Sequence, residues 1–219
     1  MNIITIERKV LEKNDEIAEA NRARFRQHRL FVCNIVSSPG AGKTTLLERT
    51  IEVLRGEMRI GVVEGDVQTD LDAQRVARYG VPAVQIVTNG GCHLEARLVR
   101  DALDSLDLSA LDLLVVENVG NLVCPANYDL GEALKVVVLS TTEGDDKPLK
   151  YPAMFRRASA LVVNKIDLLP YVNASVATIE KHARDINPAL TIFQTSCTTG
   201  DGIPRWCEWL RQQVAAARA

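Results

Sequence analysis

The chain has 219 residues, 47% of them hydrophobic and 25% charged, with a formal net charge of −2. This length is typical of one domain with a small appendage, and the near balance of charge argues against a nucleic-acid binder, which would present a basic face. No hydrophobic run approaches the roughly 20 residues that span a bilayer, and the first 29 residues are too densely charged for a signal peptide, so we expect a cytoplasmic protein without a membrane partner.

Residues 1–29 form a charged segment that differs from the rest of the chain. The stretch ERKVLEKNDEIAEANRARFRQ is rich in helix formers but has few large hydrophobic residues to anchor it. We expect a solvated helix that packs on the edge of the domain formed by residues 30–219. A partner-binding arm is the alternative.

Seven short runs rich in β-branched residues follow, separated by helix-forming stretches. The central runs are almost entirely hydrophobic, as in strands that are buried on both faces of a parallel sheet. This alternation predicts a three-layer α/β fold with a mostly parallel, roughly seven-stranded sheet and ligands at the carboxyl ends of the strands. The expected strands lie near residues 30–36, 59–64, 82–87, 112–117, 134–140, 160–164 and 190–195. The expected helices lie near residues 42–55, 70–79, 91–105, 152–158, 174–185 and 203–217.

The first run leads into SSPGAGKT, which matches the P-loop pattern G-x-x-x-x-G-K-[ST] except that Ser37 replaces the first glycine. Gly40 and Gly42 still allow the backbone to point its N–H groups at a phosphate, and the following helix directs its positive end there. We expect Lys43 to reach the β and γ phosphates and the Thr44 hydroxyl to bind Mg²⁺ in a P-loop NTPase fold. The predicted phosphate-binding residues are Ser38, Pro39, Gly40, Ala41, Gly42, Lys43, Thr44 and Thr45.

The tetrapeptide NKID directly follows the sixth run and indicates a guanine site. The Asp167 carboxylate can accept hydrogen bonds from the guanine N1–H and amine, a pair of donors that adenine lacks. Asn164 would contact the purine or brace the loops, and the stem of Lys165 would lie over the ring. Ser196 and Cys197 belong to the loop TSCTTGDG, which is expected to close over the guanine carbonyl. We therefore expect GTP rather than ATP.

Acidic residues end two of the runs beside the phosphate loop. Glu117 ends the fourth run, and Asp66 follows the second. Such carboxylates can hold a water of Mg²⁺, which keeps few direct protein ligands. Asp66, Asp70 and Asp72 are candidates for metal contact or for orienting the attacking water, although Asp70 can equally be a helix N-cap. The predicted Mg²⁺ residues are Thr44, Asp66 and Glu117, and the predicted catalytic residues are Lys43, Asp66, Asp72 and Glu117.

A set of soft ligands follows in TNGGCHLEARLV and VENVGNLVCPA. Cys92 and His93 stand at the expected start of a helix, whose N-terminus lowers the pKa of a thiol, and thiolate with imidazole suits Zn²⁺ or Ni²⁺. Cys124 lies in a loop from the same edge of the sheet. Three ligands are too few for a closed structural site, so two chains that meet here would supply six. Core packing is the alternative for these cysteines, and it is our expectation for Cys33 and Cys207.

Six segments together resemble the family of hydrogenase nickel-incorporation GTPases known as HypB: SSPGAGKTTLLE, EGDVQTDLDA, NGGCHLEA, VENVGNLVCPA, TTEGDDKPLKYP and VNKIDLLPYV. The resemblance covers roughly residues 30–205. It implies a metal-binding GTPase of the dimerising (SIMIBI) P-loop class, with an interfacial metal site at Cys92, His93 and Cys124. The adjacent Cys-His pair resembles this branch more than the related urease accessory GTPases, which carry a Cys-Pro-His motif.

The resemblance also implies a biological role. The family forms a GTP-dependent homodimer that helps to deliver Ni²⁺ to the large-subunit precursor of [NiFe]-hydrogenase, together with a nickel-insertion partner protein. Some members carry an N-terminal cysteine motif or histidine-rich stretch, whereas residues 1–29 contain no cysteine and only His28, so no separate storage site is expected. Two alternatives are a urease-type or cobalamin-type metallo-GTPase chaperone with another client, and a non-catalytic metal carrier whose nucleotide is only structural.

Overall fold

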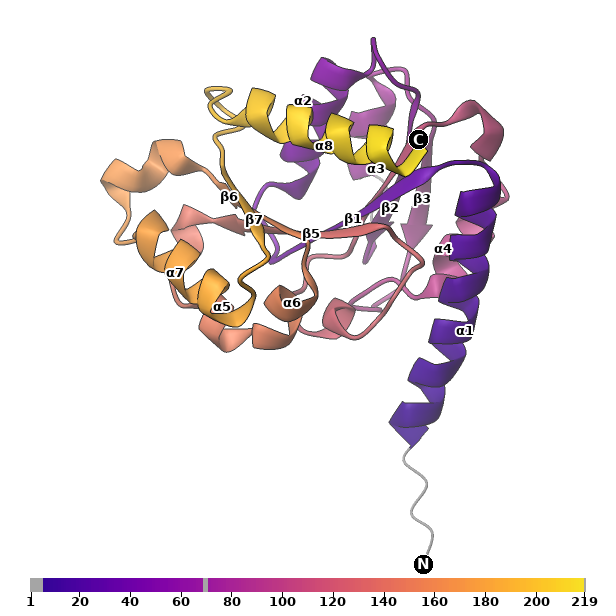
Figure 1. The fold of residues 1–219 in the computed structure, drawn as a ribbon, viewed down its shortest axis with the longest axis horizontal. Coiled ribbons are helices and arrows are strands. Elements are labelled where there is room, and N and C mark those ends of the chain that lie inside the picture. Colours follow the sequence, from indigo (N-terminus) through magenta and orange to yellow (C-terminus); the bar gives the residue numbers. More distant parts are fainter. Residues whose placement is uncertain (1–5, 69–70, 219) are drawn as a thin grey trace, which may run out of the picture.

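Seven strands form one parallel sheet through the middle of the molecule (Figure 1). The computed structural model describes residues 6–68 and 71–218. The strand order is β3-β2-β4-β1-β5-β6-β7, and every neighbouring pair is parallel. The strands are β1 (Phe31–Ser37), β2 (Ile60–Asp66), β3 (Ala83–Val87), β4 (Leu113–Glu117), β5 (Leu134–Ser140), β6 (Ala160–Asn164) and β7 (Thr191–Gln194). The predicted sheet is thus confirmed, with each strand in its expected place.

The central strands are buried along their length because helices cover both faces of the sheet. Every residue of β1, β4 and β6 is buried, and successive side chains of a strand point to opposite faces. On β1, Cys33 and Ile35 join the core on one face, whereas Val32 and Val36 join cores on the other. This two-sided burial explains why the runs in the sequence are hydrophobic without alternation.

Helices on the two faces complete the three layers (Figure 1). One face is packed by α2, α3 and α8. The other is packed by α1 and α4 over β2 and β4, and by α6 and α7 over β5 and β6. The helices are α1 (Ile6–Gln27), α2 (Lys43–Leu54), α3 (Leu71–Ala77), α4 (Ala96–Leu103), α5 (Lys147–Lys150), α6 (Pro152–Arg157), α7 (Val176–Ile186) and α8 (Ile203–Arg218). None of the described helices is long and apolar enough to cross a membrane.

The helix expected near residues 91–105 begins later than predicted. It is α4, which starts at Ala96, so Cys92 and His93 precede it in a turn and do not lie at a helix N-terminus. Tertiary contacts explain the difference, since Leu94 is fully buried and its N–H donates to Asn118 Oδ1 (3.0 Å). The helix expected near residues 70–79 is α3, and its suggested N-cap, Asp70, lies outside the described residues.

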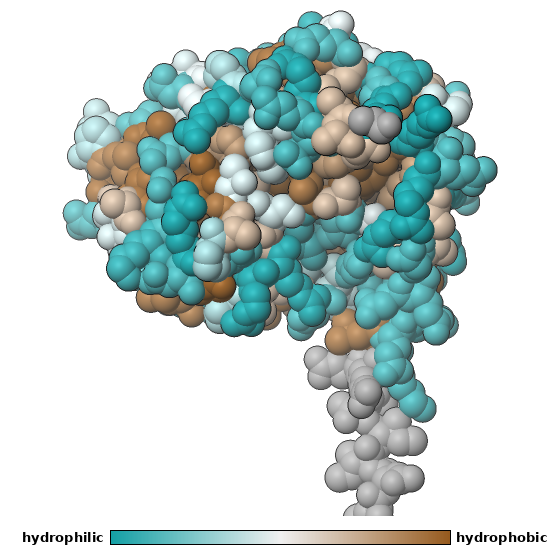
Figure 2. Space-filling view, in the orientation of Figure 1, coloured by the Kyte–Doolittle hydropathy of each residue, from teal (hydrophilic) through white to brown (hydrophobic). Residues whose placement is uncertain are grey.

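Helix α1 lies along the edge of the domain beside α4 (Figure 1). Its inner side includes the buried residues Ala18 and Phe25, and its outer side is largely hydrophilic (Figure 2). A solvated helix packed on the domain edge was expected here. Phe25 of this helix shares a core with the sheet, so the helix packs as part of the domain surface. The division into an extension of residues 1–29 and a domain of residues 30–219 stays a prediction.

Candidate nucleotide and metal sites

The phosphate loop lies between the end of β1 and the start of α2, at the carboxyl ends of the strands. Gly42 has a φ of +99°, and a Cβ atom there would come within 2.5 Å of Asn164 Nδ2. Glycine fits this position without strain, whereas a larger residue would not. Lys43 Nζ donates a hydrogen bond to Ser37 Oγ (3.1 Å). The serine in place of the usual first glycine therefore holds the lysine ammonium within the loop.

A cavity of about 480 Å³ opens in front of this loop. Thr44 Oγ1 donates to Glu117 Oε1 (2.8 Å), and Lys43 Nζ lies 4.0 Å from the same oxygen. Ser38 and Ala41 shape the loop itself, since the Ala41 N–H donates to Ser38 O (3.4 Å). Residues expected to contact phosphate, Mg²⁺ and the attacking water thus share one cavity. Its lining includes Pro39, Gly40, Gly42, Lys43, Thr44, Thr45, Asp66, Asp72, Glu117 and Lys165.

Two carboxyl groups lie on neighbouring strands at this edge of the sheet. Glu64 and Glu117 are register partners on β2 and β4, and the residues are 1% and 4% exposed. Burial raises the pKa of both carboxyls, while the Lys43 ammonium opposes the rise for Glu117. Glu64 Oε1 and Glu117 Oε2 have no hydrogen-bond partner among the described residues. Buried carboxyl oxygens without partners fit a site for Mg²⁺, which binds oxygen ligands.

Glu64 is not among the predicted site residues, although a charged residue within a buried hydrophobic strand is a signal of a functional site. The predicted residues Asp66 and Asp72 line the cavity from β2 and α3. Asp66 Oδ1 accepts a hydrogen bond from the Gln68 N–H (2.9 Å), and Asp72 forms an ion pair with Arg75 (3.1 Å). Both carboxylates therefore lie beside the phosphate loop and are held by residues of their own segment.

A second cavity, of about 440 Å³, adjoins the first and shares Gly42, Thr45 and Lys165 with it. Lys165 Nζ donates to Gly40 O (2.7 Å), so the side chain spans the phosphate loop. Two adjoining cavities suit a ligand with a phosphate part and a base part. The second is lined by Gly42, Thr45, Asn164, Lys165, Asp167, Leu168, Cys197 and Thr198.

Asn164 braces the loops around this second cavity, which was one of its two expected roles. Its Nδ2 donates to Ala41 O (3.1 Å), and its Oδ1 accepts from Thr195 Oγ1 (3.2 Å) and Cys197 Sγ (3.3 Å). Ser196 is buried, and its Oγ accepts from the Thr199 N–H (3.1 Å). Ser196 therefore supports the loop from within, while its neighbour Cys197 reaches the cavity.

The three predicted soft ligands lie together. The ligand atoms of Cys92, His93 and Cys124 all lie within 4.8 Å of one another. The two Sγ atoms are 3.0 Å apart, and Cys92 Sγ is 3.5 Å from His93 Nδ1. His93 Nε2 is buried without a hydrogen-bond partner among the described residues, and its ring packs on Tyr128 with centroids 4.0 Å apart. Two thiols and an imidazole at this spacing fit a borderline-soft divalent metal.

The expected cause of thiolate formation at Cys92 is wrong. Because the residue precedes α4, no helix N-terminus lowers its pKa. Instead the hydrogen bond with the Cys124 thiol, and then burial, raise the pKa of Cys92. Burial lowers the pKa of His93, so its imidazole is neutral at pH 7 and available to a metal. A metal ion at this site must therefore displace thiol protons.

Both sites are joined by the segment of residues 117–124 that follows β4. Asn118, next to Glu117, accepts a hydrogen bond from the Leu94 N–H (3.0 Å) through its Oδ1. Asn121 Nδ2 donates to Cys92 O (3.2 Å). Neither asparagine is among the predicted site residues, because their partners lie far away along the chain. The segment connects the predicted Mg²⁺ carboxylate with all three soft ligands.

Comparison of the chain with known proteins identifies its family. The family model described as "CobW/HypB/UreG, nucleotide-binding domain" matches residues 31–194. Hydrogenase maturation factor HypB of Escherichia coli (strain K12) is 50% identical over 98% of this chain and 74% of its own length. The HypB of Azotobacter vinelandii is 52% identical over 96% of this chain and 70% of its own length. This chain belongs to the HypB family.

A solved HypB structure supports the same relationship. The crystal structure of HypB from Helicobacter pylori in complex with nickel is 40% identical to this chain, with a TM-score of 0.89. It covers 93% of this chain and 96% of its own. The HypB-family chain is therefore a P-loop nucleotide hydrolase by family and by fold, as the resemblance in its sequence predicted.

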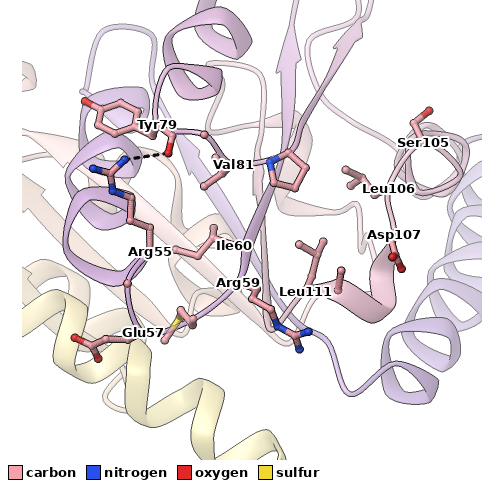
Figure 3. Close-up of a pocket in the computed structure, with 15 residues that line it drawn as sticks. Arg55, Glu57, Arg59, Ile60, Tyr79, Val81, Ser105, Leu106, Asp107 and Leu111 are labelled. Carbon is pink, nitrogen blue, oxygen red and sulfur yellow. Dashed lines mark hydrogen bonds between the residues drawn. The ribbon is translucent and has the colours of Figure 1, made fainter.

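A larger cavity, of about 600 Å³, lies at the opposite, amino ends of β2, β3 and β4 in this HypB-family chain (Figure 3). Its charged lining residues already have partners. Arg55 donates to Tyr79 O (3.0 Å), as Figure 3 shows, and Arg59 pairs with Asp112 (2.8 Å). Glu57 and Asp107 are likewise bound, to Arg211 and Ser109. The chemistry predicted from the sequence thus lies at the other end of the strands.

Proposed function

We propose that this HypB-family chain hydrolyses GTP and uses the nucleotide cycle to gate nickel binding and release during maturation of [NiFe]-hydrogenase. The observation that carries the proposal is the segment of residues 117–124, which begins at Glu117, the proposed Mg²⁺ carboxylate, and ends at Cys124, a proposed metal ligand. A shift of Glu117 on hydrolysis would move the loop that holds Cys92 and Cys124. Hydrogenase is the proposed client protein because the relatives are named hydrogenase maturation factors. Nickel is the proposed metal because the Helicobacter pylori structure contains it.

Guanine is the proposed base because of Asp167. This residue lines the second cavity, beside the loop that Asn164 braces at Cys197. A carboxylate there can pair with both the N1–H and the amine of guanine. Adenine would leave the carboxylate without these donors, and buried polar groups without partners are costly. Lys165, which already spans the phosphate loop, would cover the ring with its stem.

Hydrolysis is proposed to take place in the first cavity. Lys43 would contact the β and γ phosphates, while Thr44 and Glu117 would hold Mg²⁺, which neutralises phosphate charge. Asp66 and Asp72, which line this cavity, would bind a metal water or orient the attacking water. The described lining of this cavity includes no glutamine, a residue that positions water in other GTPases, so we expect slow turnover.

Nickel or zinc is the proposed metal at Cys92, His93 and Cys124, because thiolates and a neutral imidazole bind both ions well. Three donors leave the ion incompletely coordinated within one chain. We therefore propose a GTP-dependent homodimer with twofold symmetry, in which the three donors of the second chain meet those of the first at the symmetry axis. Val123, which is 60% exposed next to Cys124, would be covered in this dimer. The partners proposed for the cycle are the hydrogenase large-subunit precursor and a nickel-insertion protein.

Phosphate release by the purified chain tests the hydrolysis step. We expect slow turnover of GTP in Mg²⁺, little turnover of ATP, and loss of turnover in Lys43→Ala, because the phosphates lose their cation. Nickel binding to the nucleotide-free Lys43→Ala variant should stay unchanged, which shows that the variant is folded. Turnover of ATP at the rate of GTP would contradict the base assignment. Nickel binding without any turnover in the wild-type chain would favour a non-catalytic metal carrier.

A further inference from the structure

Helix α1 contacts both segments that carry the soft ligands. Asn14 Oδ1 accepts a hydrogen bond from the Ala96 N–H (2.9 Å), and Asn14 Nδ2 donates to Asp129 O (2.8 Å). Ala96 follows shortly after Cys92 and His93, at the start of α4. Asp129 follows Cys124 and comes directly after Tyr128, whose ring packs on His93. One asparagine side chain thus bridges the chain just after the two ligand-bearing segments.

A second asparagine, two helical turns later, makes a parallel bridge. Asn21 Nδ2 donates to Ala96 O (2.9 Å) and to Leu130 O (3.1 Å). The spacing of seven residues places Asn14 and Asn21 on the same face of α1. Both are buried, at 5% and 1% exposure. The two side chains together bind both backbone groups of Ala96 and two successive carbonyls after the Cys124 loop.

The backbone of α1 also approaches the second segment closely. Gly131 has a φ of +90°, and a Cβ atom there would lie 2.6 Å from Ala18 O and 2.9 Å from Asn21 Cβ. Arg22 forms an ion pair with Asp129 (2.6 Å) from the same side. Glycine is therefore required where the helix meets the loop. These contacts hold residues 129–131 against α1 independently of the asparagine bridges.

Simple packing of a surface helix does not account for these asparagines. A buried leucine would pack on α4 without the cost of burying an amide. That cost is visible at Asn21, whose Oδ1 has no hydrogen-bond partner among the described residues. Buried polar residues that are retained at such a cost are best known for fixing one geometry over others. What these two fix is the spacing between the start of α4 and residues 129–130.

We propose that Asn14 and Asn21 are positioning residues for the metal site, because they hold the Cys92–His93 segment and the Cys124 segment at a fixed separation. The inference rests on the proposed metal function. The ligands come from two loops, so the distance between their sulfur atoms, 3.0 Å here, depends on what joins those loops. Groups that orient metal ligands from outside the site typically change metal affinity about 10–100-fold when they are removed.

The test measures nickel affinity by competition with a chromophoric chelator, using the full chain and the variants Asn14→Leu and Asn21→Leu. We expect each variant to bind Ni²⁺ about tenfold more weakly, with a changed thiolate-to-nickel absorption band. Metal-free GTP turnover should stay at the wild-type value, since neither residue contacts the nucleotide cavities. Asn14→Asp keeps the acceptor for the Ala96 N–H but loses the donor, so its affinity should lie between those of wild type and Asn14→Leu.

Arg24→Ala is the matched control. Arg24 lies on the same helix and pairs with Asp104 at the far end of α4 (2.8 Å), away from the ligand segments, so its loss should leave nickel affinity unchanged. Wild-type affinity and absorption in both leucine variants would overturn the inference while leaving the metal function intact. Should the leucine variants fail to fold, Asn14→Asp decides, because wild-type affinity in that variant overturns the inference. A wild-type chain that binds no nickel would overturn both the metal function and the inference.

Discussion

The side chain of Asn164 joins the phosphate loop to the loop after β7. It donates to Ala41 and accepts from Thr195 and Cys197, so both its amide nitrogen and its amide oxygen already bind the two loops. Its neighbours differ, because Lys165 and Asp167 face the second cavity. At the scale of single residues, the motif NKID therefore contains one residue that braces the pocket and two that are proposed to contact the base.

Asp167→Asn should lower GTP affinity by roughly a hundredfold or more. The carboxylate offers guanine two acceptor oxygens, whereas the amide offers one oxygen and an NH₂ group that faces a guanine donor. Xanthosine triphosphate, which has a carbonyl oxygen in place of the amine, should bind the variant better than GTP does. Nickel binding to the nucleotide-free protein should stay intact. Titration with fluorescent nucleotides measures the affinities. Joint loss of nucleotide and nickel binding would show instead that the variant is misfolded or that the base pocket is misassigned.

Among the elements, β4 and the segment after it connect the two sites. Asn118 is buried, and its Oδ1 accepts from the Leu94 and Val119 N–H groups (both 3.0 Å) while its Nδ2 donates to Asn34 (3.3 Å). Leu94 packs beneath Gly65 on β2. The turn that holds Cys92 and His93 is therefore fastened to the strand end that carries Glu117.

Asn118→Leu should leave three buried polar groups without their partner and lower the free energy of unfolding by about 3 kcal/mol. Denaturant unfolding monitored by circular dichroism measures this loss. In the protein that remains folded, nickel affinity should respond less to the nucleotide than in the wild-type chain. An unchanged free energy of unfolding together with an unchanged nucleotide response would contradict the proposed connection.

The sequence predicted the strands well and the ligand-bearing turns less well. Hydrophobic runs identify buried strands because both faces of β1, β4 and β6 are covered by helices. The start of α4 was predicted too early, because the Leu94 and Ala96 N–H groups donate to Asn118 and Asn14, and these bonds set the backbone conformation there. Such partners come from distant parts of the chain and leave no periodic signal. Glu64 does carry a sequence signal, a charge within a hydrophobic run, but its pairing with Glu117 is defined only by the register of β2 and β4.

For the whole molecule, the ends of the sheet differ in chemistry. The nucleotide cavities lie at the carboxyl ends of the strands, and the Cys92–His93–Cys124 cluster is fastened to the same edge through Asn118. The large cavity at the amino ends has its charges paired internally. One edge of the sheet thus combines the proposed phosphate site with the proposed metal site, and α1 contacts the chain just after both ligand-bearing segments.

Nickel affinity in two nucleotide states tests the proposed gating most directly. The dissociation constant would be measured by chelator competition, once with bound GDP and once with a non-hydrolysable GTP analogue. We predict that the two values differ at least about fivefold, and that nickel changes the affinity for the analogue relative to GDP by the same factor, as linkage requires. Equal nickel affinities in the two states would contradict the gating of the metal by the nucleotide.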